Sequence, residues 1–119
     1  MADSEIDERA KAVVLTTGYT VAGVTIEKEL DVISAECVYG MNILKDFFAS
    51  VRDVVGGRSG ATQNVLRDAR KIVLDELRSE AAALGADAVI GVDLDYQELN
   101  GGQKGGMIML VASGKAVTT

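Results

Sequence analysis

The first regular pattern along the chain is the alternation of apolar and polar side chains that is typical of β-strands. β-Branched residues become frequent from residue 13, and Ile26, Leu30 and Val32 alternate with acidic residues. The pattern is interrupted by a glycine-bearing turn near residue 18 and ends near residue 40. Residues 13–40 are therefore expected to form two or three strands.

Two segments in the middle of the chain repeat their apolar residues every three or four positions, which is the period of an amphipathic helix. The first spans residues 43–55 and stops at a pair of glycines. The second runs from about residue 62 to 84, and Gly85 follows it as a typical C-terminal cap. The second helix is predicted to face a sheet through one apolar stripe. This stripe consists of Val65, Leu66, Ala69, Ile72, Val73, Leu77, Ala81 and Leu84.

The last third of the chain returns to a strand pattern. Residues 88–96 alternate, a glycine-rich turn follows, and residues 107–117 are largely apolar, so the two segments are predicted to pair as a hairpin. The order of elements predicts an α+β fold of two layers, in which an antiparallel β-sheet is covered by one long helix plus a shorter helix. We expect residues 13–119 to form this single domain and the polar residues 1–12 to be a flexible N-terminal tail outside the core.

The final predicted strand is apolar on both of its faces over residues 107–112. Its odd and even sets are Met107, Met109 and Val111, and Ile108, Leu110 and Ala112. The predicted helices suffice for one face of the sheet, so the other face needs cover from the N-terminal segments of the same chain or from neighbouring subunits. We favour neighbouring subunits, because exposed apolar patches usually mark interfaces.

Composition narrows the range of functions. The 119 residues suffice for one domain, and 12 basic against 18 acidic residues give a formal net charge of −6. The absence of histidine excludes Ser-His-Asp and Cys-His catalysis and histidine-based zinc sites. An acidic chain with 4% aromatic residues lacks the basic face that nucleic-acid binding uses, and no apolar run approaches the roughly 20 residues of a membrane span. We expect neither nucleic acid nor a membrane as a partner.

Cys37 is the only cysteine, so no disulfide can form within the chain. This indicates a reducing compartment and favours the cytoplasm. Cys37 stands between small and aromatic neighbours, which is typical of a buried small hydrophobic side chain rather than a reactive thiol.

Gly57, Arg58 and Ser59 are the candidate anion-binding residues. They stand just before the long predicted helix, where free backbone N–H groups and the helix dipole favour an anion and where Arg58 can bind phosphate or carboxylate through two hydrogen bonds. The segment lacks the lysine and the spacing of a P-loop, so nucleotide hydrolysis is not indicated. The alternative is a turn between helices in which Arg58 pairs with an acidic neighbour.

Other polar and aromatic residues carry weaker functional hypotheses. Asp93 and Asp95 share a strand face and could offer oxygen ligands to a hard cation, but alternating acids are also typical of the solvated face of a strand. Tyr19 and Tyr96 could line a ligand pocket at a subunit boundary or simply stand at an edge. We assign no metal ligand, no catalytic residue and no cofactor.

Four segments together resemble the YbjQ-like family of small bacterial proteins. They are VVLTTGYTVAGVTI near the start, VVGGRSG, LGADAVIGVDLDY and the pattern A-x-G-x-AV at residues 112–117, where this chain has Ser113 and Lys115 inside an ending that is usually A-Y-G-T-A-V. The resemblance covers residues 13–119. It implies a dodecin-like subunit that forms a ring, typically a pentamer or two stacked pentamers, and it carries a label of heavy-metal binding.

These observations lead to three functional hypotheses. The leading one is a non-enzymatic homo-oligomer, a pentamer or decamer, that binds a small anionic ligand or ion at subunit boundaries. The second is heavy-metal binding by the Cys37 thiols of several subunits in the oligomer. The third is a small enzyme that acts on an anionic metabolite held at residues 57–59, with Asp93 or Asp95 as acid or base.

Overall fold

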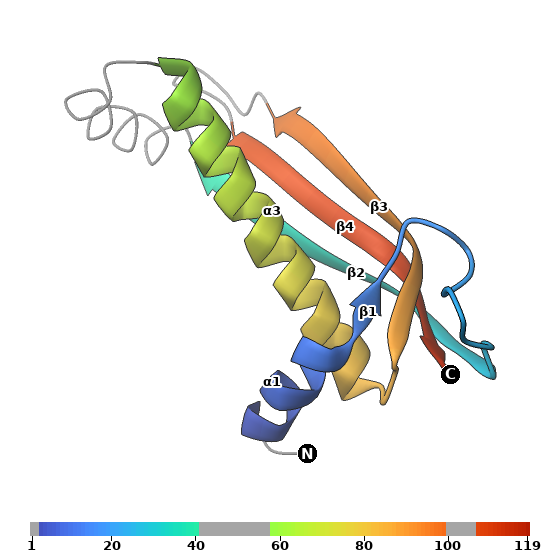
Figure 1. Cartoon of the computed structure of the whole chain (residues 1–119). Helices are drawn as coiled ribbons and strands as arrows, with labels where there is room; N and C mark the ends of the chain where they lie inside the picture. The colour runs from blue at the N-terminus through green and yellow to red at the C-terminus, as the bar shows by residue number, and fades with distance from the viewer. Residues whose placement is uncertain (1–2, 41–57, 100–106) are drawn as a thin grey trace.

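The computed structural model of the chain describes residues 3–40, 58–99 and 107–119. The long helix α3 crosses one face of a four-stranded sheet, and the short helix α1 lies beside its C-terminal half (Figure 1). The elements are α1 (Asp3–Ala12), β1 (Val14–Leu15), β2 (Lys28–Gly40), α3 (Arg58–Ala83), β3 (Ala88–Leu99) and β4 (Met107–Thr118). The predicted α+β class is confirmed. The shorter helix predicted at residues 43–55 lies outside the described residues.

The sheet has the strand order β1-β3-β4-β2 and is mixed. β3 and β4 pair antiparallel as the predicted hairpin, and β2 pairs antiparallel with the other side of β4. The prediction of a purely antiparallel sheet is wrong, because β1 runs parallel to β3, with Val14 opposite Ala88. The physical reason lies in the helices that precede the two strands. β1 follows α1, which packs on α3, and β3 follows the C-terminal end of α3. Both strands therefore start at the same end of the sheet.

The face of the sheet that packs against α3, called the inner face, holds the main core. Leu110 and Ala112 of β4 and Ile33 and Ala35 of β2 are buried there. They meet the buried residues of α3, which repeat every fourth position: Ala69, Val73, Leu77 and Ala81. The predicted helix stripe is thus confirmed at its centre.

The predicted stripe is wrong at Ile72, whose side chain is 48% exposed. Successive helical residues are turned by about 100°, so a contact line through Val73 leaves Ile72 on the flank of the helix. Leu84 lies just beyond the end of α3 and is also exposed. The helix itself begins at Arg58, four residues before the predicted start at 62.

The sequence analysis expects residues 1–12 to lie outside the core. In the structure, part of this segment contributes to the core. Ala10 of α1 is buried, and the half-buried Ile6 packs against the same cluster that contains Val73 and Leu77. Ile6 and Ala10 are four residues apart and so share one side of α1, and the buried Val13 follows just after the helix ends. Because most of the remaining positions are charged, the sequence pattern gives only a weak indication of this short apolar face.

The face of the sheet opposite α3, called the outer face, is covered at one end only. There, Val21 and Ile26 from the segment between β1 and β2 pack over the buried Ala88, Ile90 and Val117. The N-terminal segment therefore supplies part of the cover that the sequence predicted this face to need.

Away from that end, the outer face carries the odd-numbered side chains of β4 and their neighbours on β2. Val32 is 72% exposed, Val38 and Met107 are also exposed, and Met109 and Val111 are half-buried. The described residues place no element over these side chains. The same β4 strand thus buries Leu110 against α3 and leaves its other side open.

Candidate functional site

A pocket of about 260 Å³ opens on the outer face of the sheet, close to the end covered by the segment after β1. It is formed within one chain by that segment and by β2, β3 and β4. Its lining consists of Tyr19, Val32, Ile90, Gly91, Ser113, Gly114 and Lys115. We refer to it as the Tyr19 pocket.

A bulge in β3 forms one wall of the Tyr19 pocket. The register of β3 against β4 shifts between Ile90 and Asp93, and Gly91 at the bulge has φ of 60°. Glycine adopts this left-handed conformation without the steric cost that other residues meet. The Gly91 N–H donates to the Gly18 carbonyl at 2.8 Å, which ties the bulge to the segment after β1.

The bulge also makes room for the tyrosine ring. An added Cβ on Gly91 would lie 3.1 Å from Cε1 of Tyr19, so the ring packs directly on the glycine backbone. The Val92 N–H donates to the Thr16 carbonyl at 3.0 Å and is a second tie between the bulge and the same segment. Tyr19 is nevertheless 80% exposed, so its ring stands as an open wall of the pocket rather than as part of the core.

Gly114 lets β4 approach β3 closely at the floor of the pocket. An added Cβ at this position would lie 2.5 Å from Cγ1 of Val89 and 3.1 Å from the carbonyl oxygen of Ile90. Contacts this short are incompatible with a side chain unless the neighbours move. Gly91 thus accommodates the Tyr19 ring on the pocket side, whereas Gly114 makes room for Val89 of the core beneath the pocket.

The polar groups of the pocket come from β4. Lys115 presents its ammonium on the outer face, where Nζ lies 3.1 Å from Oε1 of Glu29 on β2. Ser113, two residues earlier on the same face, contributes a hydroxyl and lies opposite Asp93 of β3. The pocket thus combines an aromatic ring, aliphatic walls, one cation and one hydroxyl.

The predicted anion-binding residues lie elsewhere in the molecule. Gly57 is outside the described residues, whereas Arg58 and Ser59 are the first two residues of α3, as expected for a helix start. This end of α3 and the segment after β1 lie at opposite ends of the molecule (Figure 1). The side chains of Arg58 and Ser59 are not among those described, so anion binding there stays a prediction.

Cys37 is half-buried and packs against the core cluster beneath α3. This position agrees with its interpretation as a small hydrophobic side chain. Asp93 and Asp95 are exposed, and Asp87 accepts a hydrogen bond from the backbone N–H of Thr119 at 2.9 Å. Within residues 3–40, 58–99 and 107–119, no three or more Cys, Asp or Glu side chains are grouped to hold a metal ion.

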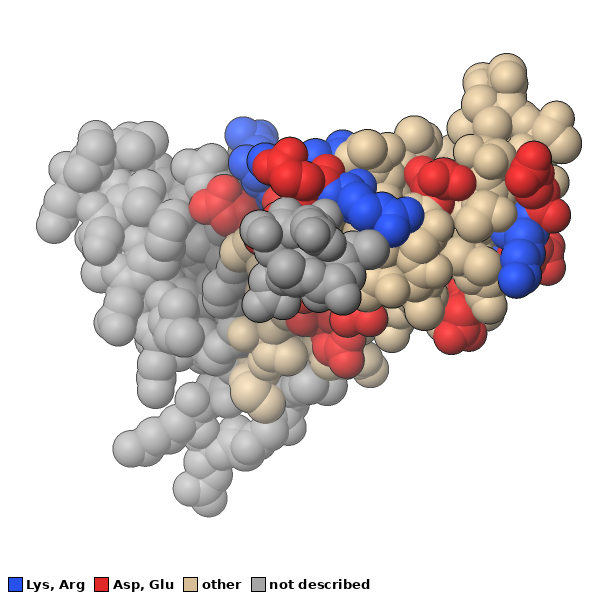
Figure 2. All heavy atoms as spheres, turned by 90° about the horizontal axis from the view of Figure 1, so that it is seen from below, with Lys and Arg blue, Asp and Glu red and all other residues tan. Residues whose placement is uncertain are grey.

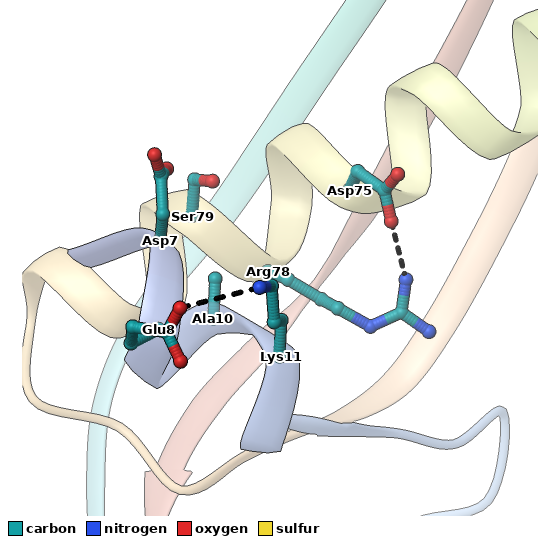
Figure 3. A pocket seen from close by; sticks show the side chains of 7 residues that line it. All are labelled: Asp7, Glu8, Ala10, Lys11, Asp75, Arg78 and Ser79. Atoms are coloured by element: carbon teal, nitrogen blue, oxygen red, sulfur yellow. Dashed lines mark hydrogen bonds and ion pairs between the residues drawn. The ribbon is translucent and has the colours of Figure 1, made fainter. Parts of the chain in front are cut away.

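A larger cavity of about 460 Å³ lies between α1 and α3 (Figure 3). Four of its charged side chains are paired within their own helices: Lys11 with Glu8 at 3.3 Å, and Arg78 with Asp75 at 2.9 Å. On the described part of the surface in Figure 2, basic and acidic side chains lie side by side rather than in patches of one sign. The larger cavity is therefore a polar gap between two helices in which both lysine and arginine are already paired with acids. The Tyr19 pocket is the better candidate site.

Comparison with known proteins identifies the family. The model of the YbjQ family, described as "Putative heavy-metal-binding", matches residues 13–119. The chain belongs to the YbjQ family. This confirms the resemblance seen in the sequence.

A similar fold occurs in a crystal structure from Pediococcus pentosaceus ATCC 25745. That protein has unknown function and belongs to the DUF74 family. The two chains are 18% identical with a TM-score of 0.57, and the match covers 89% of this chain and 96% of the other. At this level of identity the comparison shows the shared fold alone.

The sequence indicated that Tyr19 could line a ligand pocket, but it did not predict the other residues of the Tyr19 pocket, although their motifs were visible in the sequence. Three of the four segments that carry the YbjQ resemblance meet there: TTGYT at residues 16–20, VIGVD at 89–93 and ASGKAV at 112–117. The convergence of separate motifs on one pocket was the available signal.

In the part of the chain that the structure describes, no helix has the length and apolar character needed to cross a membrane.

Proposed function

We propose that this YbjQ-family protein is a non-enzymatic homo-oligomer, a ring of five subunits or two stacked rings, that binds a small anionic ligand at subunit boundaries. One observation carries the proposal: the apolar side chains on the outer face of β2 and β4 have no cover among the described residues. Exposed apolar surface of this kind is stabilised by burial against another subunit. The ring size comes from the family resemblance.

The sheet edges support a cyclic arrangement. Among the described residues, β2 is paired on one side only, and β3 is paired with β1 only at Ala88 and Val89. The two open edges belong to different strands on opposite sides of the sheet. Contacts between two different surfaces are head-to-tail, and such contacts close into a ring when the rotation between subunits allows it. Edge pairing also satisfies backbone groups that otherwise promote aggregation.

The position of the Tyr19 pocket supports ligand binding near a boundary. Val32 forms part of its lining and belongs to β2, the edge strand. A neighbouring subunit that pairs with β2 therefore lies beside the pocket. Lys115 supplies the positive charge that an anion needs.

Introducing arginine on either side of β4 tests the assembly. Met109→Arg places a charge on the outer face, so we expect a folded subunit that no longer assembles. Leu110→Arg places the same charge in the core, where Leu110 is 1% exposed, so we expect the subunit to unfold. Glu76→Arg, on the exposed surface of α3, is the matched control and leaves both fold and mass unchanged.

Circular dichroism reports the fold of each variant, and size exclusion with light scattering reports its mass. Met109→Arg protein that keeps both its fold and the mass of the wild type would overturn the proposed interface.

The location of Cys37 does not favour the heavy-metal alternative, because a half-buried thiol that packs against the core of its own subunit beneath α3 is poorly placed to meet thiols of other subunits. No described cluster favours the enzymatic alternative. The single cysteine supports our placement of the protein in the cytoplasm.

A further inference from the structure

We infer that the Tyr19 pocket binds a small aromatic monocarboxylate, with the ring of the ligand against Tyr19 and its carboxylate between Lys115 and Ser113. The inference deepens the proposed function by naming the class of ligand, and it rests on that proposal for the binding role. The pocket itself is formed within one chain, so its chemistry can be tested independently of the ring.

The size and the walls of the pocket fit one aromatic ring. A cavity of about 260 Å³ lies below the range of roughly 300 to 1,000 Å³ that holds drug-sized ligands. Tyr19 offers a ring that is fixed against Gly91 yet 80% exposed, and aromatic rings pair in offset or edge-to-face arrangements. Val32 and Ile90 supply the aliphatic part of the lining.

The charged group of the ligand is set by Lys115. Its ammonium has three donor hydrogens, and Glu29 accepts one of them at 3.1 Å. A ligand carboxylate can accept a second hydrogen bond from this ammonium and one from the hydroxyl of Ser113, which lies on the same face of β4. Glu29 then acts as a competitor, because it shares the positive charge of Lys115 with the ligand.

The neighbouring acids restrict the ligand to a single negative charge. Glu29 is bonded to Lys115, and Asp93 lies opposite Ser113 on the next strand. One carboxylate bonded to the ammonium and a second on the residue opposite Ser113 repel a doubly charged anion such as phosphate more strongly than a monocarboxylate. The pocket therefore favours benzoate-like ligands over inorganic phosphate.

Calorimetric titration of the full chain with benzoate tests the inference. We expect Lys115→Met and Tyr19→Ala each to weaken binding by roughly tenfold or more, since one removes the charge-assisted hydrogen bond and the other removes the ring. Glu29→Gln is expected to tighten binding severalfold, because it frees Lys115 from its competitor. Lys71→Met, an exposed lysine on α3 outside the pocket, is the matched control and leaves affinity unchanged.

Three further probes separate the contributions of ring and charge. Benzyl alcohol keeps the ring without the charge, acetate keeps the charge without the ring, and phosphate carries extra charge; each is expected to bind at least tenfold more weakly than benzoate. Absence of benzoate binding, equal affinity for benzoate and benzyl alcohol, or tighter binding of phosphate overturns the inference.

Native mass separates this result from the proposed function. Benzoate binding by a protein of monomeric mass supports the inference and contradicts the ring. A ring that fails to bind benzoate contradicts the inference and leaves the assembly standing.

Discussion

Replacement of Gly114 by alanine tests how closely β4 and β3 approach at the floor of the Tyr19 pocket. The new methyl carbon would lie 2.5 Å from Cγ1 of Val89 and 3.1 Å from the carbonyl oxygen of Ile90. Val89 is fully buried, and the backbone of Ile90 is held in the sheet, so neither neighbour moves away easily. The φ angle of Gly114 lies outside the left-handed region, so the predicted effect comes from the clash alone.

The size of the effect follows from two opposing contributions. Overpacking in a well-packed core costs typically about 1 to 3 kcal/mol. Alanine also reduces the conformational freedom of the unfolded chain, which stabilises the protein by about 0.4 to 1 kcal/mol. We therefore expect Gly114→Ala to lower the free energy of unfolding by about 1 to 2 kcal/mol.

Urea denaturation followed by circular dichroism at one fixed protein concentration measures this loss. Gly18→Ala is the matched control, because an added Cβ there meets its nearest atom at 3.6 Å, an ordinary contact. In the double variant with Val89→Ala the clash with the valine methyl is removed, so the combined loss should be smaller than the sum of the single losses by about 1 kcal/mol. Equal stability of the two glycine variants, or an additive double variant, would refute the proposed close approach.

Two further predictions concern the long helix and the bulge. Leu77→Ala, at a fully buried position of α3, should lower the free energy of unfolding by about 2 to 5 kcal/mol in urea denaturation. Ile72→Ala, at a half-exposed position, should lower it by about 1 kcal/mol or less. Similar losses for the two variants would show that the wrong face of α3 has been placed on the sheet. Gly91→Ala forces a left-handed conformation on alanine and crowds the Tyr19 ring, so it should cost about 1 to 2 kcal/mol and also weaken benzoate binding; unchanged affinity would contradict the role of the bulge in shaping the pocket.

The packing of α3 on the sheet was predictable because it depends on a pattern within a single helix. The apolar positions of α3 that repeat every fourth residue, such as Val73 and Leu77, identify both the helix and its buried side. Ile72 was assigned to the same side because eight apolar positions define a stripe wider than the contact with the sheet. Only the packed structure shows where that contact ends.

The N-terminal part of the fold was not predictable in the same way. β1 has two residues, and its parallel pairing with β3 joins segments far apart in the sequence. Ala10 is buried by contact between α1 and the core around α3, which leaves only a weak local signal among the charged residues. Tertiary contacts rather than local propensity decide both features.

The candidate site depends on the same long-range pairing. Tyr19, Gly91 and Lys115 come together only when the segment after β1 is tied to the β3 bulge and β4 is aligned with β3. The alternation of residues 88–96 predicted a strand but gave no sign of the extra residue at the bulge. Even so, a final strand that is apolar in both its odd and even sets indicated from the sequence that one face of the sheet needs cover besides the helices.

The native mass of the wild-type protein tests the assembly most directly. Size exclusion coupled to light scattering at micromolar concentration should give five or ten times the 12.5 kDa of one chain. A mass near 12.5 kDa would contradict the proposal that the outer face is covered by neighbouring subunits.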